Sequence, residues 1–592
     1  MSGLPLSGGR PSSAEAPSAR VNVDGSPMMS ADPQAFTPPS PGAWELEQTH
    51  LTKPASFLTA ELFPEPMMRG FSEGTRFYGL LLDYLEVAVI NRFVYMTPRP
   101  VGAPKDAKGP PPRLLFEILR RVHPVVRNRV KRAEVVLRDR VWRQDIVWWD
   151  TEVKPSLAAE ARALLAEDVA TLPDAALAAH VRRAFQFVRT ATFYHHRFNF
   201  CGMLPLGNFL IHAIEWTGLP AGELLQTMKG LSPDSAGATP ELASLRLTIL
   251  ADSDALGVLM SPRLTDAEIV AALETRPGAV GDAMRAYMNV VGLRVLGGYD
   301  IADRHAREHP ELILKIIRTA VATDPASHQA VAQNALERIR AKVPAAHRET
   351  FEDLLREAQS AYRMRDERGF HTDTLATGVA RRGVLAVGGR LKTRGRVQDA
   401  THMVDASSHE ILSLLEGGAG PSAEELAERV RWRLETPLSA APARLGLPPS
   451  EPPPAEWLPP AAAHLQKITA LLMSLMFDVH AAKDAGVQLK GFAVSPGVYE
   501  GPVRVIRSVE ELPSVQAGEV LVASSTGPTF NVILPLIGAL VTERGGVLSH
   551  AAIVSREYGL PGVVGCAGAT TRLRNGMRVR VDGGTGEVWT LT

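Results

Sequence analysis

Apolar residues recur at three- and four-residue spacing along the middle of the chain, and this spacing predicts amphipathic helices. Ser156 and Asp174 stand at the starts of the first two helices and are typical N-cap residues. Strand-like alternation is scarce between Trp44 and Gly417. The pattern therefore predicts a large, mostly α-helical domain. Its clearest helical segments are Leu157–Leu172, Ala175–Tyr194, Asn208–Leu219, Glu311–Val321, Ala330–Val343 and Arg348–Arg363.

Two segments lack this periodicity. Residues 1–42 are rich in Pro, Ser, Gly and Ala, and we predict that they are disordered. Residues 437–460 contain nine prolines, which forbid a helix and favour an extended, semi-rigid connection. A further helix is predicted from Ala461 to Ala485.

The residue pattern changes after Gly491: short runs of β-forming residues alternate with turns that contain Gly and Pro. One helical pattern, Ser549 to Tyr558, lies among them. We therefore predict a multidomain α + α/β protein, in which a hinge between Gly486 and Gly491 lets the last domain move. The expected parts are a disordered tail (1–42), a helical acceptor domain (43–417), a proline-rich linker with a connecting helix (418–485) and a small C-terminal domain (486–592).

The amino-acid composition argues against several classes of binding partner and binding site. The formal net charge of the 592 residues is zero, so there is no global electrostatic case for binding nucleic acid or an anionic membrane. The two cysteines, Cys201 and Cys566, lie in different predicted domains, which excludes in practice a disulfide framework and a Cys-based metal site. We see no signal peptide and no apolar run long enough to span a bilayer. We expect a cytoplasmic protein with no nucleic-acid or membrane partner.

One short motif carries recognisable chemistry. An apolar strand ends at Thr542, Gly545 and Gly546 form a tight turn, and Ser549 and His550 open a helix. A helix N-terminus offers unpaired N–H groups and the positive end of the helix dipole, which suit a phosphate. A histidine at this position can act as a nucleophile toward a phosphoryl donor. By itself, the motif is also compatible with a structural histidine.

The surrounding segment resembles the mobile phosphohistidine domain of the phosphoenolpyruvate-utilising enzymes, which include phosphoenolpyruvate synthase, pyruvate phosphate dikinase and the rifampin phosphotransferases. The resemblance implies a small swivelling β/β/α domain in which His550 is phosphorylated and Thr542, Gly545, Gly546 and Ser549 shape the pocket. Leu548 replaces the regulatory threonine of plant-type dikinases, so control at that position is not expected. The matching pieces are Ser495-Pro496-Gly497, Gly501, Gly518–Val522, Thr526, Pro528, Thr542, Gly545-Gly546, Ser549–Ala552, Arg556-Glu557, Gly559, Pro561-Gly562, Asp582-Gly583 and Gly586.

The helical region is similar, more loosely, to the substrate-binding domain of rifampin-phosphotransferase-like proteins. The likeness rests on Trp44–His50, Asn91–Tyr95, Trp142 with Trp148–Asp150, Gly292–Arg294, Met364–Glu367 and Gly388–Gly395. It implies that this domain holds the phosphoryl acceptor, with His50, Arg294, Arg365 and Glu367 as candidate binding residues. Arginine suits such a site because its planar guanidinium is permanently charged. A solvated helix face remains an equal interpretation of the segment from Arg365 to Glu367.

Other polar clusters are better explained structurally. His195, His196 and His212 invite a metal site, but helical geometry places 195 and 196 on different faces, and no cysteine or paired carboxylate completes a ligand set. We predict no metal there. The stretch Arg113–Arg143 holds ten Lys and Arg residues at helical spacing, which is typical of a solvated face.

No phosphoryl-donor site is recognisable. There is no P-loop pattern, and the 42 residues ahead of the helical domain are too few for a nucleotide-binding module. We therefore expect a rifampin-phosphotransferase-like chain without the ATP-grasp domain. ATP (or phosphoenolpyruvate) and Mg²⁺ are expected on an ATP-grasp-type partner, and the acceptor is a small molecule: a hydroxyl compound, pyruvate or another metabolite. Two alternatives stay open, namely a catalytically inactive binding or regulatory module, and a carrier loaded by a general phosphorelay donor.

Overall fold

The computed structural model describes residues 36–231, 240–296, 299–322, 330–477, 488–527, 530–531 and 533–591. Most of the tail predicted to be disordered lies outside the described residues, as do Pro528 and, in the predicted hinge, Gly486 and Val487. The rest of that hinge is described, and Gln488–Lys490 form a strand, β5. Among the helices that are described, none has both the length and the apolar character needed to cross a membrane. Cys201 and Cys566 are buried free thiols.

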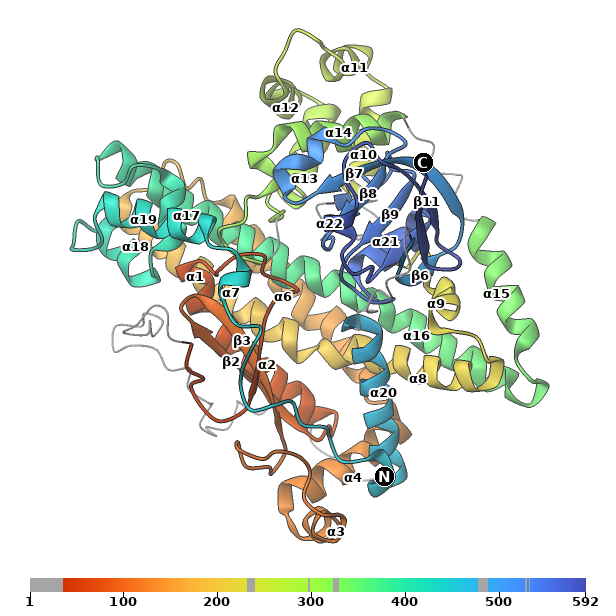
Figure 1. The fold of residues 1–592 in the computed structure, drawn as a ribbon. Coiled ribbons are helices and arrows are strands. Elements are labelled where there is room, and N and C mark those ends of the chain that lie inside the picture. The colour runs from red at the N-terminus through yellow and green to blue at the C-terminus, as the bar shows by residue number, and fades with distance from the viewer. Residues whose placement is uncertain are drawn as a thin grey trace.

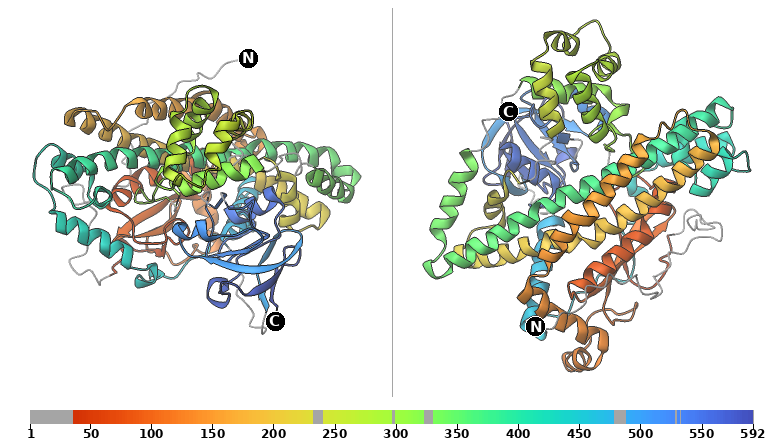
Figure 2. Two further views of the ribbon diagram at one scale, coloured as in Figure 1. Left: turned by 90° about the horizontal axis from the view of Figure 1, so that it is seen from above. Right: turned by 180° about the vertical axis from the view of Figure 1, so that it is seen from behind.

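A body of long helices confirms the prediction from periodicity (Figures 1 and 2). Helix α8 runs through Pro205 and starts nine residues earlier than its apolar pattern. The longest helices of the body are α7 (Asp174–Arg197), α8 (Asn199–Thr217), α16 (Arg348–Arg368) and α17 (Leu375–Thr393).

Both predicted N-caps are wrong. Helix α5 (Trp142–Trp148) passes through a π-helical turn, Trp149–Val153, directly into α6 (Lys154–Ala166), so Ser156 lies inside a helix whose N–H groups already have partners. Asp174 is the first residue of α7, after Pro173 at the cap position.

The chain also forms a four-stranded antiparallel sheet that its apolar pattern does not predict. Its order is β2-β3-β1-β4, and β2 shows almost no alternation because most of its side chains are half-buried. Strand β4 comes from the proline-rich segment and pairs with β1, so that segment lies against the helical body. Helix α20 (Pro460–Phe477) then packs on α4 and α8. The strands are β1 (Ala43–Leu46), β2 (Leu82–Ile90), β3 (Phe93–Pro100) and β4 (Arg444–Gly446).

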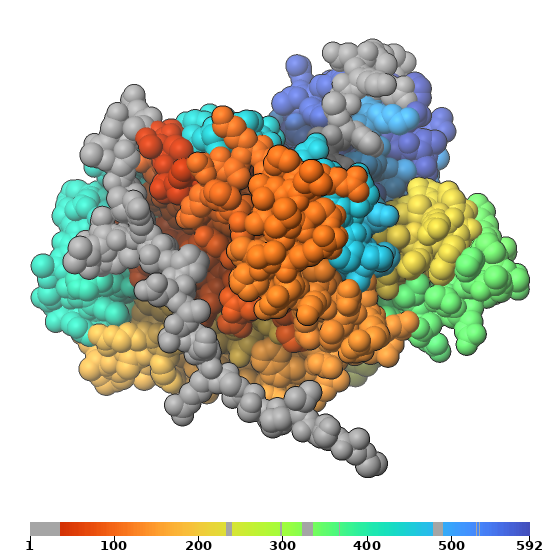
Figure 3. Space-filling model, turned by 90° about the horizontal axis from the view of Figure 1, so that it is seen from below, coloured from red at the N-terminus to blue at the C-terminus, as the bar shows by residue number. Residues whose placement is uncertain are grey.

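Helices α3 (Arg113–Val122) and α4 (Pro124–Asp139) project from the body and are seen in orange from below in Figure 3. The basic stretch predicted to form a solvated face begins here. Helix α3 also leaves Leu114, Ile118 and Val122 largely exposed.

The C-terminal domain is built on an eight-stranded mixed sheet of order β5-β12-β11-β7-β8-β9-β10-β6, in which β7, β8, β9 and β10 run parallel. Its longest helix, α21 (His550–Tyr558), begins at the residue that the sequence predicted. Leu521, Leu540 and Val554 of this domain belong to the same buried apolar cluster as the helical body, so the domain is docked on that body (Figure 1). The strands are β5 (Gln488–Lys490), β6 (Phe492–Ser495), β7 (Val498–Ile506), β8 (Val520–Ala523), β9 (Ala539–Thr542), β10 (Gly562–Val564), β11 (Arg578–Asp582) and β12 (Glu587–Thr590).

Candidate functional site

His550 is the first residue of helix α21, where a tight turn from β9 places it. Ser549 caps the helix, with its hydroxyl accepting from the Ala552 N–H at 3.4 Å. Gly545 has a φ of +106°, a conformation that favours glycine, and a Cβ there would lie 2.8 Å from the Cβ of Ser549. The first N–H groups of α21 have no partner within the helix, so the helix start retains the anion-binding character that the sequence predicts.

Only one of the two ring nitrogens of His550 has a hydrogen-bond partner among the described residues. Its Nδ1 lies 2.9 Å from the Thr526 hydroxyl oxygen, whereas its buried Nε2 has no hydrogen-bond partner among the described residues. Burial, reinforced by the positive charge of Arg365, lowers the pKa of His550 to about 3. The ring is therefore neutral at pH 7. If Nδ1–H donates to Thr526, the lone pair lies on Nε2, and the site presents a neutral nitrogen nucleophile.

The loop before His550 is docked on the C-terminal end of α20. The Gly546 N–H donates to the Met476 carbonyl oxygen at 3.1 Å, and the Leu548 N–H donates to the Leu475 carbonyl oxygen at 3.1 Å. A Cβ on Gly546 would lie only 2.1 Å from the Leu475 oxygen. These two N–H groups are thus occupied in the docked arrangement. Thr542 is buried and donates its hydroxyl to a carbonyl oxygen within the turn.

Two of the four predicted acceptor-binding residues lie near His550. The positive charge of Arg365 acts on both rings: it contributes to the lowered pKa of His550 and partly offsets the raised pKa of His50. Arg544, in the loop before His550, donates to the carbonyl oxygen of Gln48 at 3.2 Å. The structure therefore brings His50, Arg365 and His550 into one region, although they are up to 500 residues apart in sequence.

The other two predicted residues are engaged elsewhere in the helical body. The Arg294 guanidinium lies over the Phe370 ring, 4.3 Å from its centroid. Glu367 accepts hydrogen bonds from the Trp149 indole at 3.1 Å and from Lys154 at 2.9 Å, and it also pairs with Arg363. Acceptor binding by Arg294 and Glu367 stays a prediction, and their contacts also explain them as structural residues.

A His–Asp cluster lies close to His50, and its aspartate was not predicted from the sequence. Nδ1 of His195 lies 2.9 Å from both Asp373 Oδ2 and the Thr372 hydroxyl. Burial lowers the pKa of His195 and His196 well below the usual value and raises that of Asp373 to about 6. Asp373 lies in a π-helical turn, Gly369–Thr374. Such a turn holds one residue more than an α-helical turn, and the spacing of apolar residues does not predict it. Among the described residues, no group of three or more His, Cys, Asp or Glu side chains could hold a metal.

Arg368 and Tyr299 complete the surroundings. Arg368 donates to the His195 carbonyl oxygen at 2.6 Å, and burial lowers its pKa to about 10, so it remains a cation at neutral pH. The Tyr299 ring meets the His50 ring edge to face, with centroids 4.6 Å apart. A cavity of about 50 Å³ lies beside Arg368 and Arg365, with room for a few water molecules. It is lined by Asn199, Gly202, Met203, Leu206, Tyr362, Met364, Arg365, Arg368, Leu472, Met476 and Leu548.

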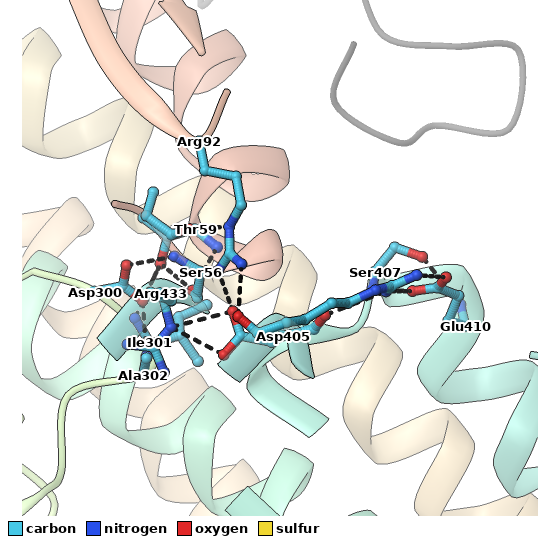
Figure 4. A network of polar contacts seen from close by, with 12 residues as sticks. Ser56, Thr59, Arg92, Asp300, Ile301, Ala302, Asp405, Ser407, Glu410 and Arg433 are labelled. Atoms are coloured by element: carbon cyan, nitrogen blue, oxygen red, sulfur yellow. Dashed lines mark hydrogen bonds and ion pairs between the residues drawn. The ribbon is translucent and has the colours of Figure 1, made fainter. Parts of the chain in front are cut away.

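Figure 4 shows a buried polar network that fixes the segments on which His50 and Tyr299 lie. Asp300, which directly follows Tyr299, accepts hydrogen bonds from the Ser56 N–H at 2.8 Å and the Thr59 hydroxyl at 2.9 Å. Ser56 lies six residues after His50. Nearby, a second buried carboxylate, Asp405, pairs with two arginines, Arg92 and Arg433.

Two parts of the chain match known protein families. Residues 515–586, which include His550, match the family described as PEP-utilising enzyme, mobile domain. Residues 206–366, which include Arg365, match the family described as rifampicin phosphotransferase fourth domain. The resemblance recognised in the sequence is thereby confirmed, and it relates the chain to enzymes that transfer phosphoryl groups.

Individual relatives match parts of the chain. The uncharacterized phosphotransferase YvkC of Bacillus subtilis is 32% identical over 226 residues, which is 38% of this chain and 25% of that protein. A probable phosphoenolpyruvate synthase of Pyrococcus horikoshii is 43% identical over 122 residues, 21% of this chain and 15% of that protein. The rifampicin phosphotransferase of Streptomyces sviceus is 43% identical over 104 residues, 18% of this chain and 12% of that protein.

The chain thus spans a quarter or less of the length of these curated relatives. Among solved structures, a chain of Thermococcus kodakaraensis aconitase X (holo-form) aligns over 18% of this chain and 100% of its own length at 26% identity. Its TM-score of 0.16 is too low to support any argument.

Proposed function

We propose that this chain relays a phosphoryl group. His550 accepts the group from a separately encoded nucleotide-binding protein of the ATP-grasp type. It then passes the group to a small molecule bound by the helical body beside His50 and Arg365. ATP (or phosphoenolpyruvate) and Mg²⁺ belong to the partner in this proposal, because no nucleotide-binding motif is recognisable in the sequence.

One observation carries the proposal: the neutral His550 ring keeps Nε2 without a hydrogen bond among the described residues and lies within the electrostatic influence of Arg365. A nitrogen nucleophile needs a free lone pair. A transferring phosphoryl group needs fixed positive charge, which Arg365 and the nearby Arg368 supply.

The docked arrangement also supports a relay with movement. The cavity beside Arg365 and Arg368 has room for a few water molecules only. An acceptor larger than that requires the small domain to leave the helical body and return. Access of a partner protein to the half-buried His550 requires the same movement.

The test is to incubate the full chain with a candidate ATP-grasp partner, Mg²⁺ and ATP radiolabelled in its β and γ phosphates. The expected result is an acid-labile, base-stable label on the chain that His550→Gln abolishes. His409→Gln, which changes an exposed histidine of α18 (Ser408–Leu415), should retain the label. A chain that stays unlabelled beside an active partner would contradict the relay and favour the inactive module.

A further inference from the structure

The carboxylate of Glu47 holds the His50 ring in one orientation. Glu47 Oε1 lies 3.2 Å from His50 Nδ1 and also accepts the backbone N–H groups of Thr49, at 2.5 Å, and His50, at 2.7 Å. The Glu47 side chain is 9% exposed, so it is fixed, whereas that of His50 is 44% exposed. With Nδ1 engaged, Nε2 of His50 is left without a partner among the described residues.

The segment that carries His50 contacts the loop before His550. Arg544 of that loop reaches the Gln48 carbonyl oxygen, two residues before His50. The Tyr299 ring supports the imidazole edge to face. The charged groups that act on His50 from the helical body are Asp373 and Arg365. A carboxylate-oriented imidazole therefore lies two residues from a contact between the helical body and the domain that carries His550.

We propose that His50 is the general base for phosphoryl transfer from His550, that Glu47 positions it, and that the acceptor consequently bears a hydroxyl group. This inference rests on the proposed relay. A carboxylate that binds one ring nitrogen, with the other nitrogen directed at the reacting proton, is the arrangement by which a histidine acts as a base. An acceptor that attacks through an anionic oxygen has no proton to lose and needs no such pair.

The transfer step balances as follows. The acceptor hydroxyl oxygen forms a bond to phosphorus, and the bond between phosphorus and His550 Nε2 breaks, returning its electron pair to the imidazole. The hydroxyl proton moves to Nε2 of His50. The Glu47 carboxylate stabilises the resulting imidazolium, and release of that proton to solvent restores the site.

The charges around His50 determine how the step depends on pH. Partial desolvation by the surrounding protein opposes protonation of His50, but the charge and hydrogen bond of Glu47, aided by Asp373, raise its pKa above the usual value, while Arg365 partly offsets this rise. His50 acts as a base only when it is deprotonated. Transfer should therefore increase with pH through this raised pKa.

The test needs neither the natural donor nor the natural acceptor. Phosphoramidate transfers its phosphoryl group to histidine and releases ammonia, so it can load His550. Methanol then serves as the probe hydroxyl, and methyl phosphate and the phosphohistidine signal are followed by ³¹P NMR between about pH 6 and pH 9. Wild-type transfer should rise with pH and then level off. His50→Gln should lower the plateau by about 10²–10⁴-fold and flatten the profile.

Glu47→Gln should retain a slower phase whose midpoint lies at lower pH, because the charge that raises the pKa of His50 is gone. This shift distinguishes positioning from a structural role, and it decides the question if His50→Gln fails to fold. Unchanged rates and profiles in both variants would overturn the general base and leave the relay intact. Failure of phosphoramidate to load His550 would contradict the relay, and the base with it.

Discussion

The Gly546 N–H donates a hydrogen bond to the Met476 carbonyl oxygen, 3.1 Å away, and so joins the loop before His550 to the end of α20. The contact is possible only because residue 546 has no side chain: a Cβ would lie 2.1 Å from the neighbouring Leu475 oxygen. The glycine pair thus serves two purposes. Gly545 supplies the turn geometry, and Gly546 supplies the close approach to α20.

Gly546→Ala should therefore destabilise the docked arrangement while leaving the fold of the small domain intact. Amide hydrogen exchange should become faster at the C-terminal end of α20 and in the loop before His550. Gly389→Ala in α17 is the matched control, because a Cβ there meets no atom within 4 Å. Equal protection of the α20 end in wild type and Gly546→Ala would show that this contact does not hold the domain in place.

The Thr526 hydroxyl should determine which His550 nitrogen reacts. It lies 2.9 Å from Nδ1, and loss of such a hydrogen bond costs about 1 kcal/mol or somewhat more. Thr526→Val should therefore load from phosphoramidate about tenfold more slowly. It should also give a mixture of the two phosphohistidine isomers by ³¹P NMR. Thr526→Ser, which keeps the hydroxyl, should behave as wild type; a single Nε2 isomer in the valine variant would count against this role.

Acid should destabilise the protein through His550. Its pKa is about 3 in the folded protein, whereas an unperturbed histidine has a pKa of 6.5. Between these values the unfolded chain binds a proton that the folded chain does not. Stability is therefore lost as pH falls from about 6.5 toward 3, by at most about 1.4 kcal/mol per pH unit. Urea unfolding at pH 7 and pH 5 should show a larger loss for wild type than for His550→Gln, and equal losses would refute the shift.

Arg365 and Glu367 lie two positions apart on α16 but should differ in role. Arg365→Gln should reduce transfer from phosphorylated His550 to methanol by about 10²–10³-fold, because fixed charge near the phosphoryl group is lost. Glu367→Gln should lower the free energy of unfolding by about 1–3 kcal/mol through its broken pairs with Lys154 and Arg363, with transfer little changed. Methyl phosphate formation and urea unfolding measure the two effects. Equal loss of transfer in both variants would place Glu367 in the site as well.

The local features of the His550 motif could be predicted because adjacent residues determine them. Strand β9 ends at Thr542 and α21 begins at His550, as predicted, because turn glycines and an N-cap serine act over a few residues. The caps of α6 and α7 could not be predicted in the same way. Helix α6 continues from its predecessor through a π-helical turn and gives no start signal, whereas α7 begins one residue earlier than predicted, with Pro173 at the cap position.

The acceptor side of the site was harder to predict because it depends on contacts between distant segments. His50 and Arg365 came from a family resemblance, and their proximity to His550 follows from docking of one domain on another. Asp373 and Tyr299 had no signal in the sequence, since a π-helical turn directs the first and the anchored loop at Asp300 places the second. Strand β2 of the antiparallel sheet was missed because its half-buried side chains alternate weakly.

The most direct test of the account is to locate the phosphoryl group itself. The full chain is treated with phosphoramidate, and the modified residue is identified by ³¹P NMR and peptide mass spectrometry under alkaline conditions. The account predicts one phosphoryl group on Nε2 of His550 ahead of the exposed His409, lost in His550→Gln and kept in His409→Gln. Modification of His409 and other exposed histidines, with His550 left unmodified, would contradict it.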